Sequence, residues 1–97
     1  MNKIELEKIK EKALNDHIPI IMDDTLEVIE RYMKEIKPKR ILEIGTAVGY
    51  SAMCFSEFLD KDGKIDTIER DEVRAEEAKE NFKRVSVEEK INLYIGD

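Results

Sequence analysis

The spacing of hydrophobic residues changes several times along the chain, and these changes predict alternating helices and strands. Charged segments with apolar residues three or four positions apart are typical of amphipathic helices. Short, nearly continuous apolar runs are typical of buried parallel strands. The pattern predicts helices over residues 2–14, 24–36, 50–59 and 72–84, and strands over residues 40–44, 64–69 and 91–95. We expect Leu6, Ile9 and Ala13 to lie on one face of the first helix, Asp23 or Asp24 to cap the second helix, and Asp71 to cap the fourth.

The order of these elements predicts an α/β fold. Strand, helix, strand, helix and strand in succession give a parallel three-stranded sheet with right-handed crossovers and the order 3-2-1. This is half of a doubly wound, Rossmann-like fold with two extra N-terminal helices. We therefore expect residues 1–38 to form a helical cover and residues 39–97 to form the βαβαβ unit. The apolar strand at 40–44 predicts helices on both of its faces.

The glycine loop after the first predicted strand is the clearest candidate for chemistry. Gly45 allows the chain to turn, and Gly49 allows a close approach where the next helix begins. Backbone N–H groups at such a junction can bind an anion. Glu69 ends the second strand, 24 residues after Gly45, where a carboxylate can accept hydrogen bonds from both hydroxyls of a ribose. Glu43 lies in an apolar strand and needs a hydrogen-bonding partner, so we expect it to face a ligand crevice.

The same residues allow three other interpretations of the loop. A βα turn could use the two glycines for geometry alone. A dinucleotide site requires G-x-G-x-x-G, but position 47 is Ala47 and no third glycine follows. A Walker loop requires lysine before the serine, where this chain has Tyr50. The pattern thus favours a nucleotide-like ligand that is neither a dinucleotide nor a ligand of a Walker loop.

Composition narrows the range of functions. The 97 residues carry a net charge of −6, which argues against this chain alone binding nucleic acid. The single cysteine, Cys54, excludes an internal disulfide and predicts a buried thiol in a reducing, cytoplasmic compartment. No signal-like segment and no apolar run long enough to span a bilayer is present, so no membrane partner is expected.

Three segments together resemble a known family. Ile-Leu-Glu-Ile-Gly-Thr-Ala-Val-Gly-Tyr-Ser-Ala at 41–52 is similar to the first motif of class I S-adenosylmethionine-dependent methyltransferases, in particular the catechol and caffeoyl-CoA O-methyltransferase group. Residues 65–69 and 91–97 resemble the second and third motifs, and the Ile-Pro-Ile segment at 18–20 resembles bacterial members, some of which methylate a hydroxylated uridine of tRNA.

The resemblance implies a cofactor site for S-adenosylmethionine at positions of this chain that match the motifs. Residues of the first motif would surround the methionine part, with the Ser51 hydroxyl on its carboxylate. Glu69 would bind the ribose, with Arg70 beside the adenine and Asp97 near its edge. The full set of expected cofactor-binding residues is Glu43, Gly45, Gly49, Tyr50, Ser51, Glu69, Arg70 and Asp97.

The resemblance also implies chemistry that these residues do not carry. In the family the divalent metal (Mg) ligands and the general-base lysine lie on and after the fourth strand. We therefore expect no metal ligand or catalytic residue here, and a cofactor-binding half that has no turnover by itself. The acceptor would be a hydroxyl on a small phenol, a coenzyme A ester or a tRNA nucleoside. The alternative is a non-catalytic half-domain. The edge of the first strand that would pair with the family's fourth strand has no partner here, which predicts a homodimer or other self-association.

Overall fold

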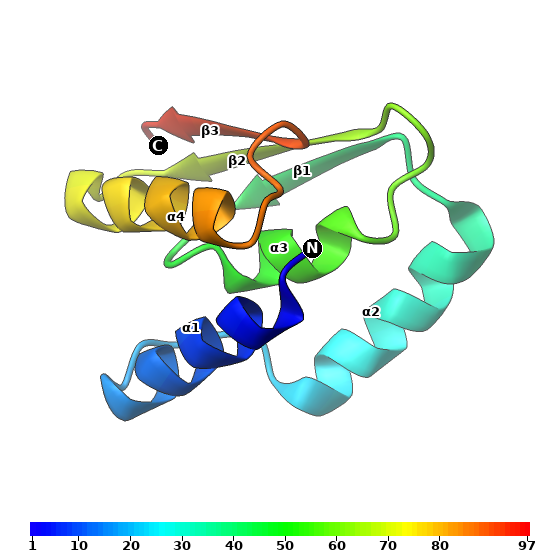
Figure 1. Cartoon of the computed structure of the whole chain (residues 1–97). Helices are drawn as coiled ribbons and strands as arrows, with labels where there is room; N and C mark the ends of the chain where they lie inside the picture. The colour runs from blue at the N-terminus through cyan, green and yellow to red at the C-terminus, as the bar shows by residue number, and fades with distance from the viewer.

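The computed structural model describes residues 1–97 as four helices and three strands (Figure 1). The three strands have the bounds expected from the sequence, and the predicted fold class is confirmed. The helices are α1 (Lys3–Asn15), α2 (Asp23–Ile36), α3 (Tyr50–Ser56) and α4 (Glu72–Arg84), and the strands are β1 (Arg40–Ile44), β2 (Lys64–Glu69) and β3 (Ile91–Ile95).

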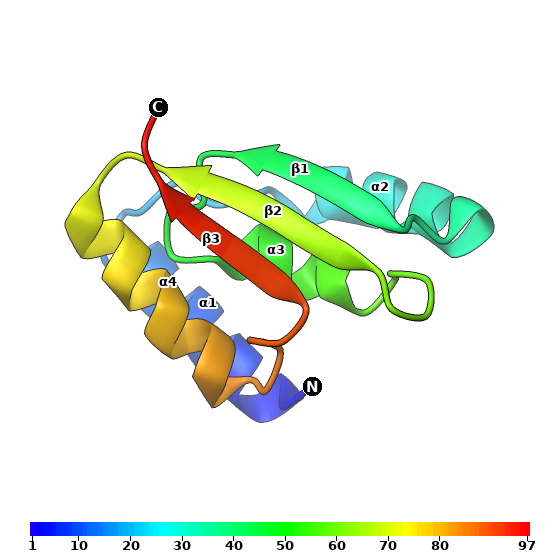
Figure 2. The ribbon, with the colours of Figure 1, turned by 90° about the horizontal axis from the view of Figure 1, so that it is seen from above.

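The strands form one parallel sheet in the order β1-β2-β3, which is the predicted 3-2-1 order read from the other edge (Figure 2). In its register Glu43 lies opposite Thr67, and Glu69 lies opposite Ile95. Because the strands are parallel, their carboxyl ends meet at one edge of the sheet. The loop after β1, residue Glu69 and the residues after β3 are thereby brought together.

All four helices lie on the same side of the sheet (Figure 1). Helices α3 and α4 pack directly on the strands, while α1 and α2 pack on α3. Ile65 and Thr67 on the covered face of β2 are fully buried. The hydrophobic core is continuous from α1 to β3, so residues 1–38 and 39–97 share it. The division into these two parts remains a prediction.

The opposite face of the sheet has no helix over it (Figure 2). Leu42 is 68% exposed, Ile44 is 73% exposed, and Tyr94 on β3 is 53% exposed. The prediction that β1 has helices on both faces is therefore wrong for this chain. The apolar residues do form a strand, but only Ile41 and Glu43 point toward the helices.

The end of one helix agrees with the sequence prediction, and the end of another does not. Asp71 caps α4, because its carboxylate accepts from Val73 N at 2.9 Å and Arg74 N at 3.3 Å. Helix α3 ends at Ser56, earlier than the predicted residue 59. The chain then makes a tight turn, in which Phe58 N donates to the carbonyl of Phe55.

The structure contains no helix with the length and apolar character that crossing a bilayer requires.

Candidate functional site

Two cavities adjoin the glycine loop at the carboxyl ends of the strands. The first has a volume of about 190 Å³ and lies between the loop, the start of α3 and the extended segment 19–21. The second has a volume of about 260 Å³ and is lined by Glu69, Arg70, Asp97 and neighbouring apolar residues. Gly45 lines both cavities, so the two form one candidate site around the loop.

Gly45 shapes the space that the two cavities share. Its φ of +89° belongs to the region that favours glycine, and its N–H donates to the carbonyl of Ile68 at 2.8 Å. A Cβ at this position would meet no atom within 4 Å. Since Gly45 lines both cavities, a side chain here would project into open space that a ligand could otherwise occupy.

Gly49 is needed for a different reason. Its φ is +90°, and a Cβ here would lie 2.5 Å from Cε1 of Phe82, which is buried on α4. The predicted close approach is therefore made to the Phe82 ring, and Gly49 lines neither of the two cavities. The loop is consequently held tightly against α4 at its end and remains open at its beginning.

Glu69 connects the loop to the start of α4. Its Oε1 accepts from Ala47 N at 2.9 Å, and its Oε2 accepts from Asp71 N at 3.0 Å. An ionised carboxylate has about four lone-pair sites, so two remain for ligand hydroxyls. The structure thus places Glu69 at the cavity with free acceptor capacity, and Arg70 and Asp97 line the same cavity.

Glu43 lies at the centre of a chain of hydroxyl groups beneath the loop. Its carboxylate accepts from Thr67 Oγ1 at 2.7 Å and from Ser51 Oγ, and Thr67 Oγ1 lies 2.6 Å from Thr46 Oγ1. The expected hydrogen-bonding partners of Glu43 are therefore present. Burial raises the pKa of the Glu43 carboxyl, and the hydrogen bonds from Ser51 and Thr67 oppose that rise.

This network bears on two of the expected cofactor contacts. Glu43 does not line either cavity, and its side chain points toward the helices. Ser51 does line the first cavity, but its single hydroxyl proton is donated to Glu43. A ligand carboxylate that accepted from Ser51 would therefore compete with Glu43 for that proton.

The first turn of α3 supplies the buried wall of the first cavity. Tyr50 lines this cavity and is itself buried, and burial raises the pKa of its hydroxyl. One turn later, burial raises the pKa of the Cys54 thiol to about 11. Cys54 is therefore the buried, unreactive thiol that the sequence predicted.

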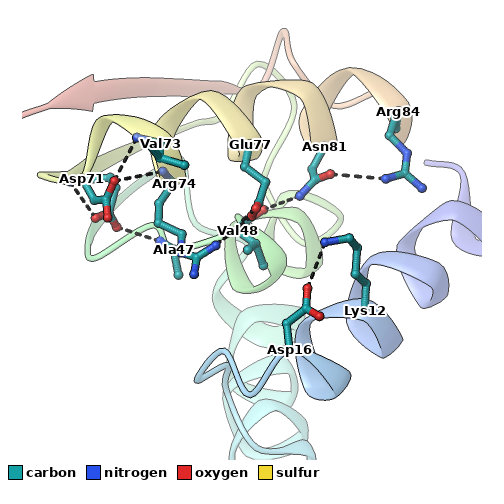
Figure 3. A network of polar contacts seen from close by, with 11 residues as sticks. Lys12, Asp16, Ala47, Val48, Asp71, Val73, Arg74, Glu77, Asn81 and Arg84 are labelled. Carbon is teal, nitrogen blue, oxygen red and sulfur yellow. Dashed lines mark hydrogen bonds and ion pairs between the residues drawn. The ribbon is translucent and has the colours of Figure 1, made fainter.

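Sequence reasoning missed the residues that hold the loop from outside the site. Asn81 of α4 is 7% exposed, and its Nδ2 donates to the carbonyl oxygen of Val48 at 2.9 Å (Figure 3). Asn81 and Val48 are separated by 33 residues, and no local pattern marks such a contact. A buried asparagine in the apolar stripe of 72–84 was the only available signal.

No group of three or more His, Cys, Asp or Glu side chains is arranged to hold a metal ion. The residues of the candidate site therefore do not fit a metal of their own. The open space at Gly45 and the free acceptor positions of Glu69 do fit a ligand with a ribose.

Comparison with known proteins identifies the family of the chain. The model of the O-methyltransferase family matches residues 1–97. A caffeoyl-CoA O-methyltransferase from Stellaria longipes is 31% identical over 65 residues, which are 67% of this chain and 27% of that protein. The chain thus spans about a quarter of the length of this curated relative.

Solved structures share the fold. A Staphylococcus aureus protein provisionally named a caffeoyl-CoA O-methyltransferase has a TM-score of 0.87 and 35% identity, covering 95% of this chain and 44% of that one. The O-methyltransferase TomG from Streptomyces achromogenes, solved in complex with SAM, has a TM-score of 0.82 and 25% identity, covering 96% of this chain and 43% of that one. With its full length matched by the family model, the chain belongs to the O-methyltransferase family.

Proposed function

We propose that this chain binds S-adenosylmethionine in the site around Gly45. The observation that carries the proposal is Glu69, whose carboxylate keeps two acceptor positions free beside the second cavity. These positions suit the two hydroxyls of the ribose, with the adenine beside Arg70 and Asp97. The methionine part then lies in the first cavity, against Tyr50 and Ser51.

The proposed reaction of the whole protein is methyl transfer to a hydroxyl oxygen of an acceptor. S-adenosylmethionine supplies the methyl group when bound, and these residues orient it, which is a large part of catalysis for such a transfer. We assign no catalytic residue within this chain, and no step is derived through a metal. The alternative is a non-catalytic half-domain that folds or self-associates without turnover.

The acceptor class is proposed from the family. A small phenol, a coenzyme A ester and a tRNA nucleoside all carry a suitable hydroxyl. The charge of −6 on these residues disfavours a polyanionic RNA at this part of the molecule. The Stellaria relative is named for caffeoyl-CoA, which is a coenzyme A ester, and this name favours that class of acceptor.

We also propose that the chain by itself associates with a second copy through β1. One edge of β1 has no neighbouring strand, and Leu42 and Ile44 expose apolar surface beside it. Unpaired strand edges of this kind recruit other chains.

Calorimetric titration with S-adenosylmethionine tests the proposed cofactor, and NAD⁺ is the matched competitor. We expect saturable binding of S-adenosylmethionine that NAD⁺ does not displace, because the loop lacks the third glycine of a dinucleotide site. Circular dichroism on the same sample establishes that the chain is folded. A folded chain that binds NAD⁺, or that binds neither compound, would refute the proposal.

A further inference from the structure

Helix α4 contacts the glycine loop through Asn81 and Phe82, and neither residue lines the two cavities. Asn81 donates to the carbonyl of Val48, and no backbone N–H donates to that oxygen. The next residue, Phe82, lies against Gly49 so closely that a Cβ would clash with its ring. Two consecutive residues of α4 therefore fix two consecutive residues of the loop.

The same helix is also tied to the residue proposed to bind ribose. It begins directly after its cap, Asp71, whose N–H donates to Glu69 Oε2 at 3.0 Å. The other oxygen of Glu69 accepts from Ala47 in the loop. The loop is thus linked to both ends of α4: to its start through Glu69 at Ala47, and to its last turn through Asn81 at Val48.

The geometry points to Asn81 as a positioning residue: through the Val48 carbonyl it holds the loop 45–49 in the conformation that binds the cofactor, without contacting the cofactor. Asn81 lines neither of the two cavities of the candidate site. The expected effect of Asn81 on cofactor affinity rests on the proposed function, whereas its expected effect on the conformation of the loop does not.

An amide is the side chain that this position requires. Asn81 Nδ2 donates to Val48, and Oδ1 accepts from Arg84 Nη1 at 3.5 Å (Figure 3). Aspartate at 81 has a similar shape, but its carboxylate can only accept, so it would face the Val48 oxygen with a second acceptor. Leucine would leave the buried Val48 carbonyl without any donor.

The test compares Asn81→Leu, Asn81→Asp and Asn81→Gln with Ala75→Gly, a buried site on the same helix whose side chain has no hydrogen-bonding group. Ala75→Gly weakens α4 but leaves the Asn81 contact intact. The first measurement is NMR hydrogen exchange of the Gly49 amide in the free protein, since this N–H is bonded to Thr46 O at 2.9 Å. The second is the dissociation constant for S-adenosylmethionine.

We expect exchange at Gly49 to be accelerated about tenfold or more in the leucine and aspartate variants, and affinity to fall by a similar factor. Asn81→Gln, which keeps the amide, should recover part of both. Ala75→Gly should change neither the exchange rate at Gly49 nor the affinity by more than about twofold, even where it lowers the Tm as much as the Asn81 variants do. Equal exchange in Ala75→Gly and the Asn81 variants would overturn the inference. Absence of binding by the wild-type chain would refute the proposed cofactor and leave the exchange test standing.

Discussion

Ala47 N lies 2.9 Å from Oε1 of Glu69, so the end of β2 holds the middle of the glycine loop that follows β1. The two residues are 22 positions apart in the sequence. The proposed ribose-binding carboxylate thus also contributes to the shape of the loop around the methionine part. Ligand binding and loop conformation should therefore respond together when Glu69 is changed.

Gly45→Ala and Gly49→Ala should separate ligand binding from stability. Both residues have a positive φ, which costs an alanine roughly 1–2 kcal/mol. At Gly49 the added methyl group also meets the buried Phe82 ring, so the loss of unfolding free energy should be greater, about 3 kcal/mol or more. At Gly45 the methyl group meets no atom but enters the open space of the site.

Urea denaturation and calorimetric titration of both variants check this prediction. Gly45→Ala should retain most of its stability and lose affinity for S-adenosylmethionine. Gly96→Ala, where the added Cβ also meets nothing and φ is not positive, is the control for stability only, because Gly96 lines the second cavity. Equal destabilisation by Gly45→Ala and Gly49→Ala would contradict the assignment of Gly49 to helix packing.

Glu43→Gln should reduce the dependence of stability on pH. Burial raises the folded-state pKa of Glu43 above its ordinary value of 4.5, so the carboxyl is harder to ionise in the folded chain. Its contribution to stability is fully present below about pH 4.5 and is lost as pH rises through the folded-state pKa. Glutamine cannot ionise and can still hydrogen-bond with Ser51 and Thr67.

The measurement is the free energy of unfolding in urea at pH 4 and pH 8. Between pH 4 and pH 8, the wild-type chain should lose more stability than Glu43→Gln does. Glu76→Gln, on the exposed face of α4, serves as the control. If wild type and Glu43→Gln lose the same stability between pH 4 and pH 8, burial of the Glu43 charge is not the cause of that loss.

Cys54 should react slowly with a thiol reagent while the chain is folded. The side chain is buried and its pKa is raised to about 11, so little thiolate forms at pH 8. The rate of reaction with Ellman's reagent should increase by orders of magnitude in urea, where the thiol is exposed. Rapid labelling of the native chain at pH 8 would show that α3 opens far more readily than its packing indicates.

Substituting Leu42 or Ile44 with lysine should reduce self-association. A charge on the uncovered face beside the free edge of β1 opposes pairing with another strand. Analytical ultracentrifugation at rising concentration should show a wild-type chain that associates and variants that remain monomeric. Val73→Lys, an equally exposed apolar site on α4, is the control. A wild-type chain that stays monomeric would remove the proposed role of β1.

The sequence was sufficient for those features that depend on local patterns. The three strands, the buried stripe of Leu6, Ile9 and Ala13, and the Asp71 cap all follow from spacing or capping chemistry within a few residues. The prediction that Asp23 or Asp24 caps α2 was wrong: Met22 occupies that position, and Asp24 accepts from the adjacent Thr25 N at 2.8 Å.

Contacts between distant segments could not be predicted in the same way. The Asn81–Val48 and Glu69–Ala47 hydrogen bonds join residues 33 and 22 positions apart, and their geometry depends on how α4 packs on the sheet. The Gly49–Phe82 approach is of the same kind. The sequence located both glycines in the loop after β1 but not which of them lines the two cavities, because packing determines that.

The most direct test of the central claim is whether Glu69 recognises the ribose hydroxyls. Calorimetric titration of wild type, Glu69→Ala and the control Glu76→Ala would compare S-adenosylmethionine with its 2′-deoxy counterpart. We predict that removing the hydroxyl weakens binding by about tenfold in wild type and Glu76→Ala, and has little further effect in Glu69→Ala. An equal loss from the deoxy ligand in all three proteins would contradict the proposed role of Glu69.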